Sequence, residues 1–396
     1  MNKCIFKLND ICDISGGYAF KSTIFKDNGI PIIRIGDISD NKINISETTV
    51  YINENIEKYK NFIISKGDIL IALSGATTGK FGIYNYDEPS LLNQRVAKLF
   101  PKKDVLNKYL YHYMNKLQDT IYNKALGCAQ PNISPKEIGE LEIYLPNINE
   151  QKAIVEVLDK AQELIDKRKK QIEALDELVK SKFIEMFGDP VSDSKGWKKV
   201  ICKDISLKIG SGATPSGGNS SYKEEGISLI RSMNVHNNKF VYKDLAFIDD
   251  EQAKKLKNVI IEENDILLNI TGASVARCCI VPSEIIPARV NQHVSIVRTK
   301  QDIIIPVFLC YQFTNDTYQR MLWNIATSGG ATREAITKQQ VENLEVIVPP
   351  IELQNKFADF VKQVDKLKFE MEKSLKELED NFNSLMEKAF NEELLK

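Results

Sequence analysis

Two long stretches of the chain repeat apolar residues at the spacing of a helix that packs along another helix. The first runs from Glu150 to Phe187 and the second from Gln354 to Phe390, and neither contains glycine or proline. At ~1.5 Å per residue each helix would be roughly 55 Å long, which exceeds an ordinary globular helix. Such a helix needs a partner along its length, so we expect the two to form an antiparallel coiled coil.

The apolar positions of the two helices match one another at a constant offset. Phe357 lies 203 positions after Ile154, and the later positions of the second helix keep that offset. The chain therefore repeats one plan, in which a globular domain is followed by a long helix. The residues expected to pack between the helices are Leu158, Ile165, Ile172, Val179, Val364, Met371, Leu375 and Phe382.

The segments outside the helices predict two similar domains of mixed α and β structure, so the fold class is α+β. We place the first domain at residues 1–149, its helix at 150–187, the second domain at 188–352 and its helix at 353–396. Short β-branched runs predict strands, and one longer stretch predicts a helix. In the first domain these are the strands Ile30–Ile35, Asp68–Leu73, Phe81–Tyr84, Arg95–Phe100 and Leu141–Leu145, and the helix Val105–Lys124.

The second domain repeats the loops of the first in the same order. The run GDILIALSGATTGK at 67–80 matches NDILLNITGASVAR at 264–277, and NQRV at 93–96 matches NQHV at 291–294. The loop with AQPNIS, ahead of LPNINEQ and the first helix, corresponds to ATREAIT ahead of the second helix. The sequence therefore predicts that both domains present the same set of loops.

This doubled and ordered set of motifs resembles the specificity (S) subunit of type I restriction–modification systems. The resemblance covers essentially the whole chain, although each motif alone is weak. It implies two target recognition domains, each reading half of a split double-stranded DNA site, and helices that dock two methyltransferase (M) subunits, with or without restriction (R) subunits. It also implies a subunit without catalysis or a cofactor of its own, with S-adenosylmethionine bound by the methyltransferase partner. Two departures lie in the second domain, His293 in place of Arg95 and ATREAIT in place of AQPNIS, and these positions are expected to read different bases or none.

Residue types suited to DNA contact gather in these loops. Arginine, asparagine and glutamine can read base edges, while serine and threonine hydroxyls bond phosphate oxygens. In the first domain the candidates are Tyr18, Lys21, Arg34, Ser74, Thr77, Thr78, Lys80, Gln94, Arg95, Gln130 and Asn132. In the second domain they are Ser211, Thr214, Arg231, Thr271, Ser274, Arg277, Gln292, His293, Thr332 and Arg333.

Each candidate also has a structural interpretation. A serine or threonine in a loop is more often a turn or cap residue. Arg34, Arg231, Gln94 and Gln292 could equally brace the fold. The charge is also balanced, at −1 for the whole chain, so a basic surface would have to come from the arrangement of residues.

Other kinds of chemistry find little support. The seven cysteines include no C-x-x-C pair and the chain has three histidines, so a metal site is not expected. The scattered cysteines fit buried thiols in a reducing cytoplasm, and no run is apolar enough to cross a membrane. The loop SGATTGK lacks the first glycine of a phosphate-binding loop, and no N-P-P-[YF] or D-P-P-Y run is present. Two alternatives remain, a coiled-coil scaffold that binds no DNA and an enzyme of an unrecognised kind.

Overall fold

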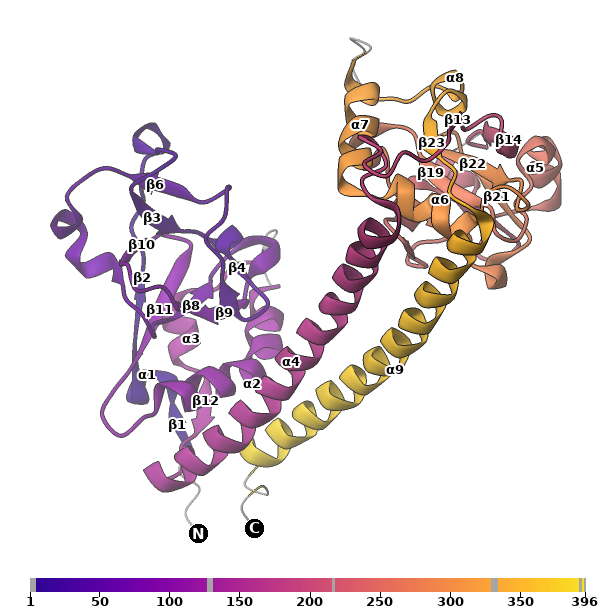
Figure 1. The fold of residues 1–396 in the computed structure, drawn as a ribbon. Helices are drawn as coiled ribbons and strands as arrows, with labels where there is room; N and C mark the ends of the chain where they lie inside the picture. Colours follow the sequence, from indigo (N-terminus) through magenta and orange to yellow (C-terminus); the bar gives the residue numbers. More distant parts are fainter. Residues whose placement is uncertain (1–4, 127–130, 216–217, 329–333, 392–393, 395–396) are drawn as a thin grey trace. The chain divides into compact units, whose positions relative to one another are not determined.

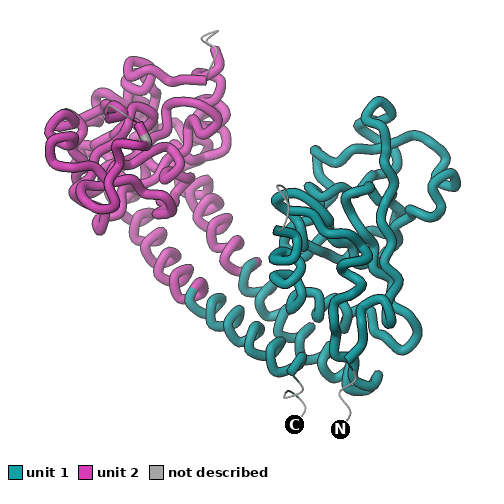
Figure 2. Tube along the Cα trace, turned by 180° about the vertical axis from the view of Figure 1, so that it is seen from behind, with its two compact units in different colours: residues 1–169, 373–396 teal, residues 170–372 magenta. Residues whose placement is uncertain are grey.

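The computed structural model describes residues 5–126, 131–215, 218–328, 334–391 and 394. The chain divides into two compact units, which Figure 2 shows in separate colours. Unit 1 contains residues 1–169 and 373–396, and unit 2 contains residues 170–372. Each unit therefore combines one globular domain with a part of each long helix.

Three sheets form the domain of unit 1 (Figure 1). The largest has the order β2 (Cys12–Gly16), β11 (Val96–Pro101), β8 (Ile69–Ala72), β9 (Phe81–Ile83), β5 (Lys42–Ile43) and β4 (Ile38–Ser39). The second has the order β6 (Val50–Ile52), β3 (Ile30–Ile33), β10 (Ser90–Leu92) and β7 (Ile63–Ile64). The third pairs β1 (Ile5–Lys7) with β12 (Glu142–Tyr144). The pairs β3–β10 and β5–β9 are parallel, and the other strand pairs of this domain are antiparallel.

One long helix covers the larger sheet of unit 1. This helix, α2 (Asn107–Ala125), buries Tyr109, Leu110 and Met114 in the same core as Ile69 and Ile71 of β8. The shorter helices are α1 (Leu8–Ile11) and α3 (Pro135–Gly139), with 3₁₀ turns at η1 (Ser22–Ile24), η2 (Ile35–Asp37), η3 (Ile56–Phe62) and η4 (Gly75–Thr77). Ser134 caps α3 by accepting a hydrogen bond from the Glu137 backbone, and this cap fixes where the preceding loop ends.

The domain of unit 2 repeats this plan. One sheet has the order β14 (Ser206–Ser211), β22 (Val294–Thr299), β19 (Ile266–Asn269) and β20 (Cys278–Ile280). Another has the order β18 (Ala246–Ile248), β15 (Ile227–Ile230) and β21 (Ala288–Val290). Two further pairs are β13 (Lys199–Ile201) with β23 (Glu345–Ile347), and β16 (Val235–His236) with β17 (Lys239–Phe240).

The main helix of the globular domain is continuous in unit 1 and divided in unit 2. Where unit 1 has the continuous helix α2, unit 2 has α6 (Pro306–Phe313) and α7 (Asp316–Thr327), which are separated at Thr314 and Asn315. The Asn315 side chain accepts hydrogen bonds from the first backbone N–H groups of α7 and so starts a new helix. The remaining elements are α5 (Asp250–Lys255), α8 (Lys338–Glu342), η5 (Gly218–Ser221), η6 (Ser232–Asn234), η7 (Lys257–Val259), η8 (Gly272–Ser274) and η9 (Ser283–Ile285).

The two predicted rods are present as α4 (Ile148–Phe187) and α9 (Ile351–Phe390). In unit 1 the first part of α4 shares a core with the last part of α9, and Lys169 lies 2.9 Å from Glu379. In unit 2 the last part of α4 shares a core with the first part of α9, and Lys368 lies 2.5 Å from Asp176. Within each unit, the two helical segments therefore pack together and run in opposite directions (Figure 1).

The residues expected between the helices face the cores. Leu158, Ile165, Val179, Val364 and Phe382 are buried. The other three, Ile172, Met371 and Leu375, are half-buried. By contrast, Leu367 and Phe369 are outside the heptad series and are exposed. The heptad register is therefore the one by which α4 and α9 bury their apolar faces.

A buried glutamine near the start of each long helix joins that helix to its domain. In unit 1 the Gln151 side chain accepts a hydrogen bond from Leu106 N at 2.8 Å and donates to the carbonyls of Asp104 and Pro146. In unit 2 the Gln354 side chain accepts from Ile305 N at 2.8 Å and makes the two corresponding donations. Both side chains satisfy buried backbone groups that would otherwise lack partners.

The secondary structure predicted for the first domain is confirmed within a residue or two at each end. The six predicted elements correspond to β3, β8, β9, β11, β12 and α2. The prediction did not include the shorter strands β1, β2, β4, β5, β6 and β7, or β10, which pairs parallel with β3. No helix of the described residues is long and apolar enough to cross a membrane. Five cysteines, Cys12, Cys202, Cys278, Cys279 and Cys310, are buried free thiols, and Cys4 and Cys128 lie outside the described residues.

Candidate nucleic-acid interface

Backbone hydrogen bonds bring the predicted loops of the first domain side by side. Leu73, the residue after β8, donates its N–H to the carbonyl of Arg95 at 2.8 Å. The carbonyl of Leu73 in turn accepts the N–H of Ile133 at 2.9 Å. Gln94 donates its N–H to the carbonyl of Tyr18 at 2.9 Å. The four loops that contain Tyr18, Ser74, Arg95 and Asn132 therefore form one cluster.

The second domain repeats the two bonds of the central residue and joins its first loop to the NQ motif by a different bond. Ile270 donates its N–H to the carbonyl of His293 at 2.9 Å and accepts the N–H of Ile336 at 2.8 Å. Gly212 donates to the carbonyl of Asn291 at 3.1 Å. The central turn is also alike, because Gly75 and Gly272 both adopt positive φ angles that favour glycine. The two clusters thus share one backbone path, and differences between them come from side chains.

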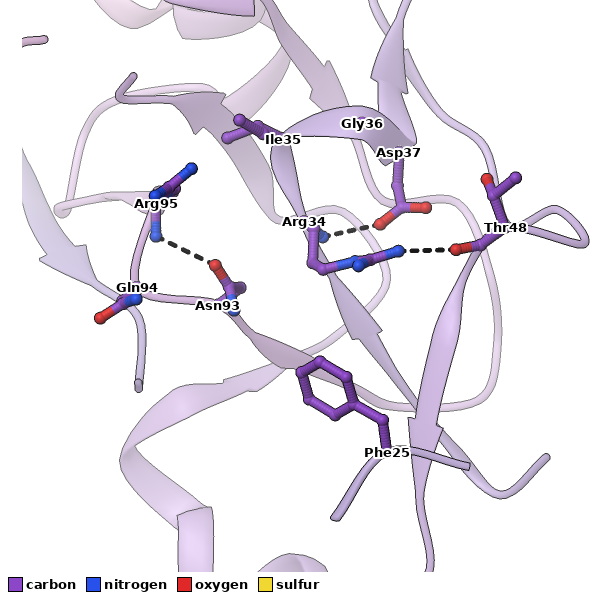
Figure 3. A pocket seen from close by; sticks show the side chains of 9 residues that line it. All are labelled: Phe25, Arg34, Ile35, Gly36, Asp37, Thr48, Asn93, Gln94 and Arg95. Carbon is purple, nitrogen blue, oxygen red and sulfur yellow. Dashed lines mark hydrogen bonds between the residues drawn. The ribbon is translucent and has the colours of Figure 1, made fainter. Parts of the chain in front are cut away.

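A cavity of about 410 Å³ opens beside the NQR loop of the first domain (Figure 3). Its lining includes the predicted residues Arg34, Gln94 and Arg95. The Arg34 guanidinium donates to the carbonyl of Thr48 at 2.6 Å, and its backbone N–H bonds Asp37 at 2.7 Å. Through these two hydrogen bonds Arg34 braces the fold, which is the structural interpretation given above. Gln94 and Arg95 are exposed, and their side chains have no hydrogen-bond partner among the residues that the structure describes.

Tyr18 belongs to an aromatic group next to this loop. Its ring lies 5.0 Å from Phe20, 5.2 Å from Tyr59 and 5.3 Å from Phe62. Tyr59 is buried, whereas Tyr18 remains 41 % exposed. A partly exposed ring held by other rings is a surface on which a base or sugar can stack.

The hydroxyl groups of the SGAT loop differ in their environments. Thr78 is buried and donates to the carbonyl of Gly75 at 2.7 Å, so its role is structural. The hydroxyls of Ser74 and Thr77 are buried without a hydrogen-bond partner within the described part of the chain. The side chains of Lys21, Lys80 and Asn132 are exposed. Among the hydroxyl residues, Ser74 and Thr77 are therefore better candidates for ligand contact than Thr78.

In the second domain the corresponding side chains are hydrogen-bonded to one another. Thr214 bonds Gln292, whose amide nitrogen lies 3.0 Å from Nε2 of His293. The other ring nitrogen of His293, Nδ1, lies 2.5 Å from the Thr271 hydroxyl. The four predicted residues Thr214, Gln292, His293 and Thr271 thus form one polar chain across three loops. Gln292 contacts its neighbours and is also exposed, so both interpretations of this residue stay open.

The other predicted residues of the second domain are half-buried. Arg231 bonds the carbonyl of Asp244 and lies 5.3 Å from the Tyr222 ring, so it braces the domain as Arg34 does. Ser274 and Arg277 lie in and just after η8, and Ser211 is the last residue of β14.

Three predicted residues, Gln130, Thr332 and Arg333, lie outside the described residues. Two asparagines of the loop cluster were missing from the predicted set. Asn93 lines the cavity and accepts the N–H of Arg95 at 3.2 Å, and Asn291 accepts that of His293 at 3.0 Å. Their position in the shared NQ motif was the signal that could have identified them.

The titratable groups outside the loops have structural environments. Burial raises the pKa of the Cys12 and Cys202 thiols to about 12, so both stay protonated and unreactive near neutral pH. His112 is buried between helices of unit 1, and its Nε2 lies 2.8 Å from Asp159. These contacts support a packing role for the two thiols and for His112, and give no indication of nucleophilic catalysis.

Comparisons with known proteins agree with this arrangement. The family model for the type I restriction modification DNA specificity domain matches residues 2–176 and again residues 194–380. The chain is 24 % identical to the type I restriction enzyme EcoBI specificity subunit of Escherichia coli over 420 residues, covering 98 % of this chain and 85 % of that protein. It is 28 % identical to the putative type I restriction enzyme MjaX specificity subunit of Methanocaldococcus jannaschii, covering 86 % and 81 %.

Solved structures show the same fold over nearly the full length. The S subunit of a type I restriction–modification system from M. genitalium matches with a TM-score of 0.51 at 16 % identity, covering 98 % of this chain and 95 % of that chain. A chain from a structure of type I restriction–modification complex assembly matches with a TM-score of 0.55, also at 16 % identity, covering 98 % and 97 %. Because the family model spans most of the sequence in two copies, the chain belongs to the type I restriction–modification DNA specificity family.

Proposed function

We propose that this chain is the DNA recognition subunit of a type I restriction–modification complex and that it reads a target split into two specified halves. The observation that carries the proposal is the duplicated loop cluster, which places base-reading residue types on the same backbone path in both domains. The differences between the clusters imply that the two halves have different sequences. Arg95 suits guanine, whereas His293 at the matching position presents a different set of donors and acceptors.

The long helices would act as spacer and docking elements in the complex. We propose that α4 and α9 pair as an antiparallel coiled coil, and that two methyltransferase subunits bind the chain, with or without restriction subunits. The balanced charge of both domains leaves few cations to neutralise phosphates. The methyltransferase subunits would therefore supply much of the DNA affinity, together with the S-adenosylmethionine and the pocket for the target base.

Sequencing the methylated bases of a strain that expresses the chain with its methyltransferase subunit tests this proposal. The expected result is one motif with two short specified halves around unspecified base pairs. Four residues inserted into both long helices add ~6 Å of helix. The spacer should then lengthen by about two base pairs at ~3.4 Å each, while both halves stay the same. A continuous motif, or altered halves, would contradict the proposal.

The scaffold alternative predicts a different outcome. A scaffold that binds only protein would give no sequence-dependent gel shift with the methyltransferase subunit present. The recognition subunit should select a subset of pooled genomic fragments, and Arg95→Ala should change which fragments are selected. The enzyme alternative predicts transfer of labelled methyl groups from S-adenosylmethionine by the chain alone, and we expect none.

A further inference from the structure

A groove of about 700 Å³ follows strand β14 of unit 2, outside the loop cluster. The polar part of its lining consists of Lys203, Lys208, Lys338, Glu342, Ser206, Ser211 and Asn258. Helix α8 supplies Lys338 and Glu342, η7 supplies Asn258, and β14 or the turn before it supplies the others. Ser211, at the end of β14, is followed directly by the loop that contains Thr214. The groove therefore continues from the candidate DNA interface.

The lysines of this groove are only partly neutralised. Lys338 lies 3.6 Å from Glu342, its one carboxylate partner among the described residues. Lys203 and Lys208 have no carboxylate within ion-pair distance in the same part of the chain. Burial and the charge of the neighbouring Arg298 lower the pKa of Lys208, while the charges of Asp265 and Glu262 raise it. Three lysines and one carboxylate line the groove, and this excess of positive charge favours a bound anion.

The first domain lacks lysine at the three matching positions, although Lys102 donates to the carbonyl of Asn9 and lies 3.6 Å from Asp13. Ile11 and Ile205 occupy matching positions, since their carbonyls accept N–H bonds at 2.8 Å from Lys102 and Lys300 respectively. Two residues before this pair, Asn9 stands in unit 1 where Lys203 stands in unit 2.

The other two lysines also have uncharged or acidic counterparts. Asp13 pairs across its sheet with Phe100, and Lys208 pairs with Arg298, which occupies the position of Phe100 in the second domain. Lys338 follows the helix cap of α8 as Pro135 follows the cap of α3. The first domain thus carries one aspartate and no cation at the three positions that hold lysine in the second.

We propose that the β14 groove binds the sugar–phosphate backbone of DNA beside the half-site of the second domain, with Lys203, Lys208 and Lys338 each neutralising a phosphate. The inference rests on the proposed DNA recognition and adds an asymmetry to it. Base readout would be carried by loops in both domains, whereas this backbone contact would belong to the second domain. The hydroxyls of Ser206 and Ser211 would supply further hydrogen bonds to phosphate oxygens.

The salt dependence of binding tests the groove. The complex of the full chain with its methyltransferase subunits is measured on target duplex between 50 and 200 mM salt, as wild type and with Lys203, Lys208 and Lys338 all changed to glutamine. Each neutralised phosphate contributes about −0.9 to the slope of log K against log salt, so the slope should become shallower by about 2.7. Wild type would then lose about 40-fold more affinity over this range than the variant, from the same slopes. The methylated motif should not change.

Lys103→Gln serves as the matched control. Lys103 is exposed and lies just beyond β11, at the strand end opposite the NQR loop, so its substitution should leave the slope unchanged. Single variants Lys203→Gln and Lys208→Gln, each expected to change the slope by about 0.9, provide the same test if the triple variant folds poorly. A slope equal to that of wild type in the groove variants would overturn the proposal.

Neutral methylphosphonate groups placed singly along the duplex locate the contact. Wild type should weaken at phosphates beside the second half-site, and the triple variant should be insensitive at those phosphates. Equal interference beside both half-sites in wild type would also overturn the inference. If wild type binds without sequence preference, the proposed function itself fails. If wild type binds the motif and the groove variants have the same salt slope as wild type, only the assignment of the groove fails.

Discussion

The loops of the two domains follow the same backbone path but hold their side chains differently. In the first domain Arg95 is exposed, and its guanidinium has no hydrogen-bond partner among the described residues. In the second domain His293 occupies the matching position and is held by Thr271 and Gln292. The backbone bonds from Leu73 and Ile270 to these two residues both measure 2.8–2.9 Å. The shared backbone positions the residue, and the side chain decides whether it is free or oriented in advance.

The interiors of the two domains differ in a similar way. Behind β11 and β22, Lys98 lies 3.3 Å from Asp68, whereas Arg298 bonds both oxygens of Asp265 at 2.8 and 2.9 Å. Asp68 and Asp265 each also accept a hydrogen bond of 2.8 Å from the backbone N–H of the residue three positions earlier. The two domains therefore keep the carboxylate and its backbone hydrogen bond, while the cation that pairs with the carboxylate differs.

The largest expected effect is a difference in stability between variants of these two ion pairs. Asp265→Asn should lower the free energy of unfolding of unit 2 by about 3–5 kcal/mol, because Asp265 is fully buried and Arg298 would lose its buried carboxylate partner and keep only the more exposed Glu262. Asp68→Asn should lower that of unit 1 by about 1 kcal/mol, since the flexible Lys98 can turn toward solvent.

The positions of the two tryptophans allow the units to be followed separately. Trp197 and Trp323 both belong to unit 2, so tryptophan emission during denaturation reports on that unit. Hydrogen exchange of the β8 segment reports on unit 1. Equal losses for the two variants would show that the pairs are energetically equivalent despite their different geometry.

The second prediction concerns a feature that the two domains share. Gln151→Ala and Gln354→Ala should each destabilise the unit concerned by about 3 kcal/mol, because each leaves a buried N–H and two carbonyls without partners. The control is Gln339→Ala, an exposed position on α8, which should stay within about 0.5 kcal/mol of wild type. A large difference between the stability losses of these two variants would show that the two glutamines are not equivalent.

The shared features are also the ones that sequence reasoning could predict. The heptad series gives α4 and α9, because one apolar face repeated over such a length is typical of paired helices. The loops could be grouped because the motifs recur in the same order. The bonds of Arg34 to Thr48, and of Thr271 to His293, could not be predicted. Each joins residues well apart in the chain, through a turn geometry that residue types alone do not determine.

The third prediction tests the loop comparison directly on DNA. Arg95→Ala should cost the complex about 1–3 kcal/mol of specific binding and relax one base of a single half-site. Thr271→Val removes the hydroxyl that orients His293, so it should broaden base choice in the other half-site with a smaller loss of affinity. Methylated-motif sequencing of both variants gives the result. If Thr271→Val leaves the motif sharp, the orientation of His293 contributes nothing to base choice.

The smallest effect concerns pH and a matched pair of residues on the helices. His112 of α2 corresponds to Tyr311 of α6, since the N–H of Leu106 and of Ile305, six residues earlier in each case, binds the matching glutamine. Burial lowers the pKa of His112, more than the hydrogen bond and charge of Asp159 raise it. Burial instead raises the pKa of Tyr311, which stays neutral across the physiological range.

Unit 1 should therefore lose stability in acid earlier than unit 2 through this position. His112 binds a proton more readily in the unfolded state than in the native state. The contribution of neutral His112 to the stability of unit 1 is therefore complete above pH ~6.5 and falls as the pH drops below that value. Lys108, which lies 2.5 Å from Asp159, opposes protonation of the ring further. Hydrogen exchange of the α2 segment between pH 7 and 5 measures the effect, and His112→Tyr, which installs the residue of the second domain, should remove the His112-dependent part. The same pH profile in wild type and in the His112→Tyr variant would mean that other groups of unit 1 control its acid stability.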